Sequence, residues 1–149
     1  MPNKFNIENI HDGTQLTIEN QNYVVVGMAQ YKTHDGATYY KIFLSDNHVI
    51  CTDSSNDDVL EFGHEIPPVI YEAPFPNEIE YGGEIYSLDI SAHQILQKKF
   101  FGIVESDCDF WDYKNDDKKI SVGILCPSKK RADVAIKMIN KNLIQITKI

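Results

Sequence analysis

The chain lacks a long apolar run. No apolar stretch follows residues 1–7, which argues against a secretory signal. Nowhere do about 18 apolar residues follow one another, the length that a membrane-spanning helix needs. Neither end carries a lipidation motif. We therefore expect a cytoplasmic protein that does not insert into a membrane.

Cysteine is scarce. The three residues Cys51, Cys108 and Cys126 form no C-x-x-C pair. Their odd number and the missing pair argue against a disulfide framework and against a zinc ribbon. Cys51 and Cys126 lie in apolar runs, so we expect buried thiols that pack as small hydrophobic groups. Aspartates flank Cys108, and their negative charge is expected to make it a poor thiolate nucleophile.

The common catalytic and cofactor motifs are absent as well. The sequence contains no glycine-rich phosphate or dinucleotide loop and no G-x-S-x-G nucleophile elbow. None of its histidines forms an H-x-x-H or H-x-x-x-H pair, and the acidic stretch 53–58 lacks the glycine and the closing glutamate of a calcium loop. We predict no catalytic residue, no cofactor and no metal ligand, although spacing carries no information on sites assembled across strands.

The chain does have an ordinary globular composition. Of its 149 residues, 42% are hydrophobic and 24% are charged. These proportions are typical of a folded domain and not of a disordered chain. A chain of this length buries enough surface to need no metal or disulfide staple. We therefore predict one domain over residues 1–149.

Turn residues recur at short intervals, and β-branched and aromatic runs fill the spaces between them. Examples are the turns at 12–13, 35–36 and 82–83 and the apolar runs at 23–26, 38–44 and 48–52. This pattern is typical of a strand meander and not of βαβ units. The predicted fold class is mainly β: two similar antiparallel hairpin and meander halves that form a sandwich or a partly open barrel, with room for one short helix.

Two segments fit more than one secondary structure. Residues 91–101 place apolar side chains at helical spacing behind a potential N-cap at Ser91. Residues 128–141 fit a helical face and also the alternation of a strand. Periodicity alone does not decide between helix and strand for either segment.

A shift of 63 residues aligns residues 16–25 with residues 79–88. Each segment reads as a short apolar strand, a polar or glycine-containing turn region and a second strand that opens with a tyrosine, which describes a β-hairpin. Between them, residues 67–76 hold four prolines, which do not fit inside a sheet ladder. We predict two halves at about 13–66 and 77–149, joined by the proline-rich linker 67–76.

Four segments, in order, carry a resemblance to a known family. They are a hairpin region from Gly13 to Gly27, an aromatic strand at 39–44, the segment 79–86 and the segment 113–122. Together they resemble the bacterial domain-of-unknown-function family 4178, over about residues 13–146. The resemblance implies an all-β fold with a strand at the end of the chain, which favours a strand in 128–141. It implies no known catalytic residue.

Charge is distributed unevenly along the chain. Residues 1–97 carry 3 basic and 15 acidic side chains, a net of −12, and residues 98–149 carry 11 basic and 7 acidic ones, a net of +4. The total of −8 is not the cationic balance that phosphate backbones attract, so nucleic acid is not an expected partner. The two regions either neutralise each other in the fold or leave an acidic face that steers a basic protein toward it.

Three function hypotheses follow. The first is a non-enzymatic domain that binds another protein through an acidic face; its candidate partner-binding residues are Asp53, Asp57, Asp58, Glu61 and Trp111. The second is an immunity or inhibitor protein that neutralises a basic toxin or nuclease. The third is a small-ligand or metal-binding β-domain, or an enzyme, with a site assembled across strands; a deep pocket would favour it. Exposed strand edges would also allow a homodimer.

Overall fold

The computed structural model describes residues 3–53, 58–69 and 74–148. Its strands are β1 (Asn3–Lys4), β2 (Gln15–Ile18), β3 (Gln21–Thr33), β4 (Thr38–Leu44), β5 (His48–Thr52), β6 (Val59–Ile66), β7 (Glu78–Tyr81), β8 (Glu84–Gly102), β9 (Cys108–Asn115), β10 (Lys118–Leu125), β11 (Asp133–Asn140) and β12 (Ile144–Lys148). Three short 3-10 turns accompany them: η1 (Ile7–Asn9), η2 (Ser45–Asn47) and η3 (Lys141–Leu143).

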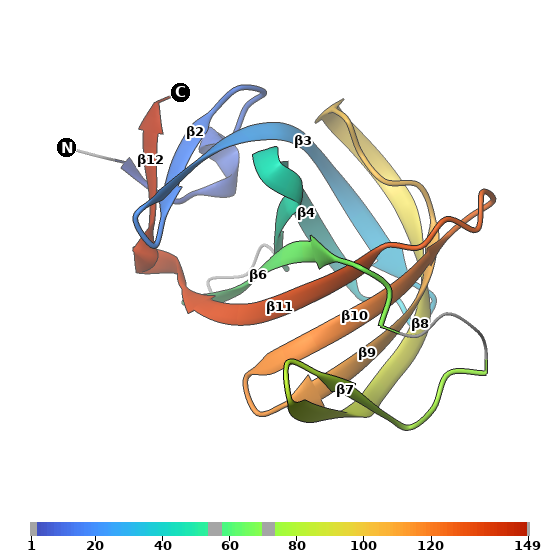
Figure 1. The fold of residues 1–149 in the computed structure, drawn as a ribbon. Helices are drawn as coiled ribbons and strands as arrows, with labels where there is room; N and C mark the ends of the chain where they lie inside the picture. The colour runs from blue at the N-terminus through green and yellow to red at the C-terminus, as the bar shows by residue number, and fades with distance from the viewer. Residues whose placement is uncertain (1–2, 54–57, 70–73, 149) are drawn as a thin grey trace.

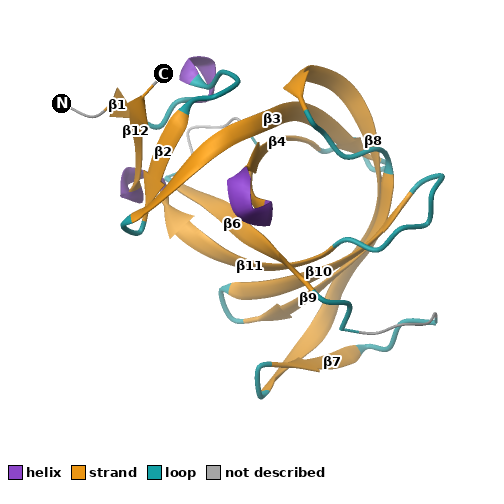
Figure 2. Ribbon diagram, turned by 45° about the horizontal axis from the view of Figure 1, so that its top comes forward, coloured by secondary structure: helices purple, strands orange, loops and turns teal. Residues whose placement is uncertain are grey.

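Eight of these strands form a closed antiparallel barrel in the order β3-β4-β5-β6-β11-β10-β9-β8, which the pairing of β8 with β3 completes. Figure 2 shows the strands following one another around a ring. The predicted mainly β class is confirmed, but the barrel is closed, which corrects the expected sandwich or partly open barrel. Two long strands close the barrel: β3 has 13 residues and β8 has 19. The hydrogen-bonded ladder between them has two register irregularities, at which the strands bend.

The remaining strands extend the barrel wall. β12 pairs with β1 and β2, and β2 pairs with the first residues of β3. Figure 1 shows β2, β12 and both chain ends on the same side of the molecule. β7 pairs with the first residues of β8. Among the described residues, no helix is long and apolar enough to cross a membrane.

Both predicted hairpins are present. β2 and β3 are joined by Glu19 and Asn20, with φ of 49° and 66°, and β7 and β8 by Gly82 and Gly83, with φ of 61° and 79°. Two central residues of positive φ match the twist of an antiparallel pair, which is why such turns are favoured in hairpins.

The segment 91–101 is strand throughout, within β8, so its helical interpretation is wrong. This part of β8 pairs with β3 on one side and β9 on the other, and these two ladders outweigh the helical spacing of its apolar residues. The strand in 128–141 is confirmed as β11. No α-helix occurs in the parts of the chain that the structure describes, so the one short helix that the prediction allowed is not found in them.

Apolar residues pack in two clusters on the outer face of the barrel wall. The strand register puts Ile42, Ile50 and Phe62 side by side on one face of β4, β5 and β6. They pack in one cluster with Leu16 of β2 and Ile144 of β12. Burial of each large aliphatic side chain stabilises the fold by about 1.5–3 kcal/mol.

The second cluster covers the outer face of β9 and β10. Tyr113, Ile120 and Val122 are its most buried members. Ile79 of β7 and Phe75 pack on them, so part of the predicted linker 67–76 covers this face. Residues 70–73 of that linker lie outside the described residues, and the boundary between two halves stays a prediction.

The seam between β3 and β8 leaves no room for a side chain at Gly27. A Cβ atom there would lie 2.0 Å from the carbonyl oxygen of Ile103. We expect Gly27→Ala to lower the free energy of unfolding by about 2 kcal/mol or more, because backbone must move to admit the methyl group. Gly13→Ala is the comparison: its φ of +86° strains any side chain and should cost about 1 kcal/mol, but nothing lies within 4 Å of the added Cβ, so its loss should be smaller. Urea unfolding of both variants tests this, and equal losses would contradict a tight seam.

Candidate functional site

The barrel encloses a cavity of about 330 Å³. Seven of the eight barrel strands contribute lining residues, so the cavity is the barrel lumen. Its volume lies in the range of sites that hold small organic molecules. Its polar lining residues include Tyr39, Lys41, Cys51, Glu61, Gln94, Glu105, Cys108, Asp112, Lys119 and Ser121.

Strand alternation explains why charged side chains enter the lumen. Successive side chains in a strand point to opposite faces. On β4, β5 and β6 the register aligns Lys41 with Cys51 and Cys51 with Glu61, one residue out of phase with the outer apolar cluster. The apolar positions are thus buried outside the wall, and the polar positions between them face inward.

Lys41 is held by a carboxylate and an aromatic ring. Its Nζ lies 3.4 Å from Oε2 of Glu105 and 5.2 Å from the centroid of the Tyr31 ring. The Tyr31 hydroxyl donates a hydrogen bond of 2.7 Å to the backbone carbonyl of Glu105, which fixes that residue beside the lumen. Burial alone would lower the pKa of Lys41, but the opposing charge of Glu105 raises it, so the ammonium stays protonated.

Lys119 lies between two carboxylates. Its Nζ is 2.5 Å from Oε2 of Glu61 and 3.3 Å from Oδ2 of Asp112. Burial opposes the charged form, but the attraction of Asp112 and Glu61 outweighs it and raises the pKa of Lys119 above its usual value. With Lys41 and Glu105, these groups give the lumen two positive and three negative charges.

Two polar atoms in the lumen wall are buried without a hydrogen bond to any described residue. They are Nε2 of Gln94 and Oδ1 of Asp112. Gln94 is 2% exposed and Asp112 is 7% exposed, and both line the cavity. The Oε1 atom of Gln94 already accepts a hydrogen bond from the Tyr39 hydroxyl, which orients the amide. A buried donor or acceptor without a partner costs about 1–3 kcal/mol, so a ligand that pairs with these atoms would recover that energy.

Apolar side chains occupy other parts of the lumen wall. Val49, Val59, Phe110, Val134, Ile136 and Met138 all line the cavity. A wall that combines placed polar groups with apolar side chains can orient and bury both parts of an amphipathic molecule. The lumen therefore suits an amphipathic molecule better than a bare ion.

Two thiols also face the cavity. Burial raises the pKa of Cys51 to about 12 and that of Cys108 to about 11, because it disfavours the thiolate. Neither thiol is therefore an activated nucleophile. Cys108 was expected to be a poor nucleophile because of its acidic neighbours, but burial is the larger cause.

The structure brings together only two of the predicted partner-binding residues, because Asp53 and Glu61 both line the cavity. Asp53 and Asp58 are exposed, and Asp57 lies outside the described residues. Glu61 belongs to the lumen, where it pairs with Lys119. Trp111 packs on Phe75 with ring centroids 4.5 Å apart, on the outer face of β9.

Sequence reasoning missed Lys41, Gln94, Asp112 and Lys119. Lys41 and Asp112 each lie among aromatic residues in a predicted strand. A charged residue among such neighbours is the one local signal that its side chain faces the barrel interior. Lys119 follows a turn and Gln94 lies in the segment with helical spacing, so neither has a local signal.

No family model, no curated protein and no solved structure matches the chain. The resemblance to family 4178 therefore stays a prediction. The geometry of the lumen carries the functional argument instead.

Removal of Lys119 tests the charge network. Lys119→Met leaves Glu61 and Asp112 close together in the lumen without their cation, and we expect a loss of about 2 kcal/mol or more in unfolding free energy at pH 7. The control is the neighbouring Lys118→Met, whose pair with Glu84 is exposed to solvent screening and should contribute much less. Chemical denaturation measures both, and similar losses would contradict a buried network.

The thiols give a test by pH. The folded-state pKa of Cys51 lies above the unfolded value of about 8.5. Stability from the neutral thiol is therefore complete below that value and is lost as the pH rises toward the folded pKa. We expect the unfolding free energy to fall as the pH rises from about 8.5 toward 12, and to fall less steeply in Cys51→Val. An unchanged slope in the variant would contradict this assignment.

Proposed function

We propose that this protein binds a small organic molecule in its barrel lumen. The observation that carries the proposal is the pair of buried atoms without partners, Gln94 Nε2 and Asp112 Oδ1, in the wall of a 330 Å³ cavity. One is a donor and the other an acceptor. A ligand that accepts from Gln94 and donates to Asp112 would satisfy both.

The wall indicates the chemistry of the ligand. The ligand needs a carbonyl-type acceptor for Gln94 and an NH donor for Asp112, and the register sets these two residues four positions apart along β8 and β9. An alkyl part would contact apolar wall residues such as Phe110 and Ile136. With the exposed Asp53, which also lines the cavity, the lining charges sum to two negative, so a carboxylate ligand is disfavoured. We infer a neutral or cationic amphipathic molecule with an amide-like or amine head group.

The two-half organisation also stays a proposal. The meander β3–β6 follows the β2 hairpin, and the meander β8–β11 follows the β7 hairpin. The pairs β3–β8 and β6–β11 join the two meanders. This order supports two similar units that build one lumen between them.

Binding of a basic protein through the acidic region remains a prediction beside this proposal, as do the inhibitor role, the homodimer and the cytoplasmic location. Asp53 and Asp58 are the described acidic candidates that are exposed. Glu61 would not contribute to such a face, because its carboxylate pairs with Lys119 in the lumen.

Ligand binding can be tested with three probes of equal chain length: hexanamide, hexylamine and hexanoate. We expect saturable shifts of the amide resonances of lumen residues with hexanamide and hexylamine, and weaker ones with hexanoate. Gln94→Met removes the free donor and should weaken hexanamide binding about five- to tenfold. Ser121→Phe should block the lumen.

The matched control is Lys118→Gln, on the outer face of the same strand as Ser121, which should bind as the unchanged protein does. Absence of saturable shifts with all three probes, or shifts that survive Ser121→Phe, would contradict a lumen site.

A further inference from the structure

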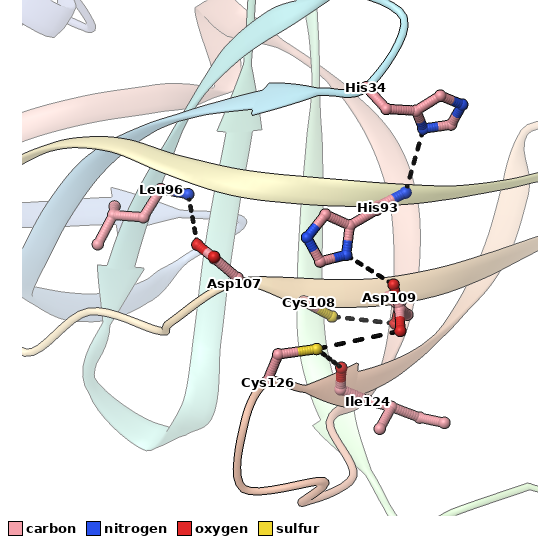
Figure 3. Close-up of polar contacts among 8 residues, drawn as sticks. All are labelled: His34, His93, Leu96, Asp107, Cys108, Asp109, Ile124 and Cys126. Atoms are coloured by element: carbon pink, nitrogen blue, oxygen red, sulfur yellow. Dashed lines mark hydrogen bonds and ion pairs between the residues drawn. The ribbon is translucent and has the colours of Figure 1, made fainter.

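A second cluster of chemically reactive side chains lies on the outer face of the barrel. The donor atoms of His93, Asp109 and Cys126 all lie within 4.8 Å of one another. His93 Nδ1 is 2.6 Å from Asp109 Oδ1, and Cys126 Sγ is 4.0 Å from Asp109 Oδ2. Figure 3 shows the imidazole of His93 and the thiol of Cys126 both directed at the carboxylate of Asp109.

Two neighbouring strands and the turn after a third build this cluster. His93 on β8 is the direct partner of Asp109 on β9, and Asp109 is in turn the partner of Ile124 on β10. Cys126 lies in the turn after β10, where its Sγ is 3.8 Å from the carbonyl oxygen of Ile124. A backbone hydrogen bond of 2.8 Å from Cys126 to the carbonyl of Asp107 holds the turn in place.

The polar groups around the cluster have other partners. Asp107 Oδ1 accepts a hydrogen bond from the backbone of Leu96, and His34 Nδ1 accepts one from the backbone of His93. Figure 3 shows the His34 ring pointing away from the cluster. His93 and Asp109 are 37% and 49% exposed, so an ion from solvent can reach them.

We propose that His93, Asp109 and Cys126 bind a divalent transition-metal ion of the zinc type. One imidazole nitrogen, one carboxylate oxygen and one thiolate sulfur are zinc ligands, and a thiolate selects against calcium and magnesium. Donor atoms around a tetrahedral zinc ion lie about 3–4 Å apart. Small side-chain rotations would bring the donor atoms of the three residues to these distances. Three protein ligands leave the fourth position to water. The site does not depend on the proposed lumen ligand.

Cobalt(II) is the probe, because a cobalt–thiolate bond gives a charge-transfer band in the near ultraviolet. The full chain, freed of metal by chelation and kept reduced, should bind one equivalent of Co²⁺ with this band, and Zn²⁺ should displace it. Cys126→Ser should abolish the band, and His93→Ala and Asp109→Asn should each weaken Co²⁺ binding at least about tenfold. Protonation competes with the metal for His93 and Cys126, so affinity should rise with pH.

Cys51→Ser and His11→Ala are the matched controls, since neither residue belongs to the cluster. Both should retain the band and the affinity. Circular dichroism of each variant checks that the barrel is folded, which we expect because His93 and Asp109 are partly exposed. A band that persists in Cys126→Ser, or equal affinity in His93→Ala and the unchanged chain, would overturn the proposal. Absence of saturable Co²⁺ binding would overturn it as well.

Discussion

The pairing of two ammonium groups with three carboxylates inside the barrel is the interaction on which the rest of the structure depends. Lys41 and Lys119 cannot lie in the lumen without Glu105, Glu61 and Asp112, because an unpaired charge in such an environment costs several kcal/mol. These five residues come from four strands and one loop. The network is complete only when the barrel is closed, so closure and charge pairing require each other.

A polar lumen moves the apolar core to the outside of the wall. The two large apolar clusters lie on the outer face, under β2 and β12 on one side and under β7 and Phe75 on the other. This explains why the strands outside the barrel exist: without them Ile42, Ile50 and Tyr113 would face water. Apart from Leu60, no side chain of these clusters lines the lumen, so a cavity remains.

The sequence predicts the local part of this fold well. Asn20 and Gly82-Gly83 mark tight turns because these residue types accept positive φ, and the flanking strands follow from alternation. Closure was not predictable, because the β3–β8 ladder joins residues about 60–75 positions apart and no local pattern encodes it. Both faces of the wall bury side chains, so alternation could not show which face held Lys41. The cluster of His93, Asp109 and Cys126 arises from register, which spacing along the chain does not show.

Strand β9 connects the two proposed sites. Cys108, Phe110 and Asp112 line the lumen, while Asp109 and Trp111 alternate with them on the outer face. A slip of one residue would exchange the faces, move Asp112 away from Lys119 and Asp109 away from His93. The ladders to β8 and β10 on either side prevent that slip. The register of β9 therefore places Asp112, whose Oδ1 has no partner among the described residues, inside the barrel and Asp109, the candidate metal ligand, outside it. The strands that close the barrel hold both residues in position.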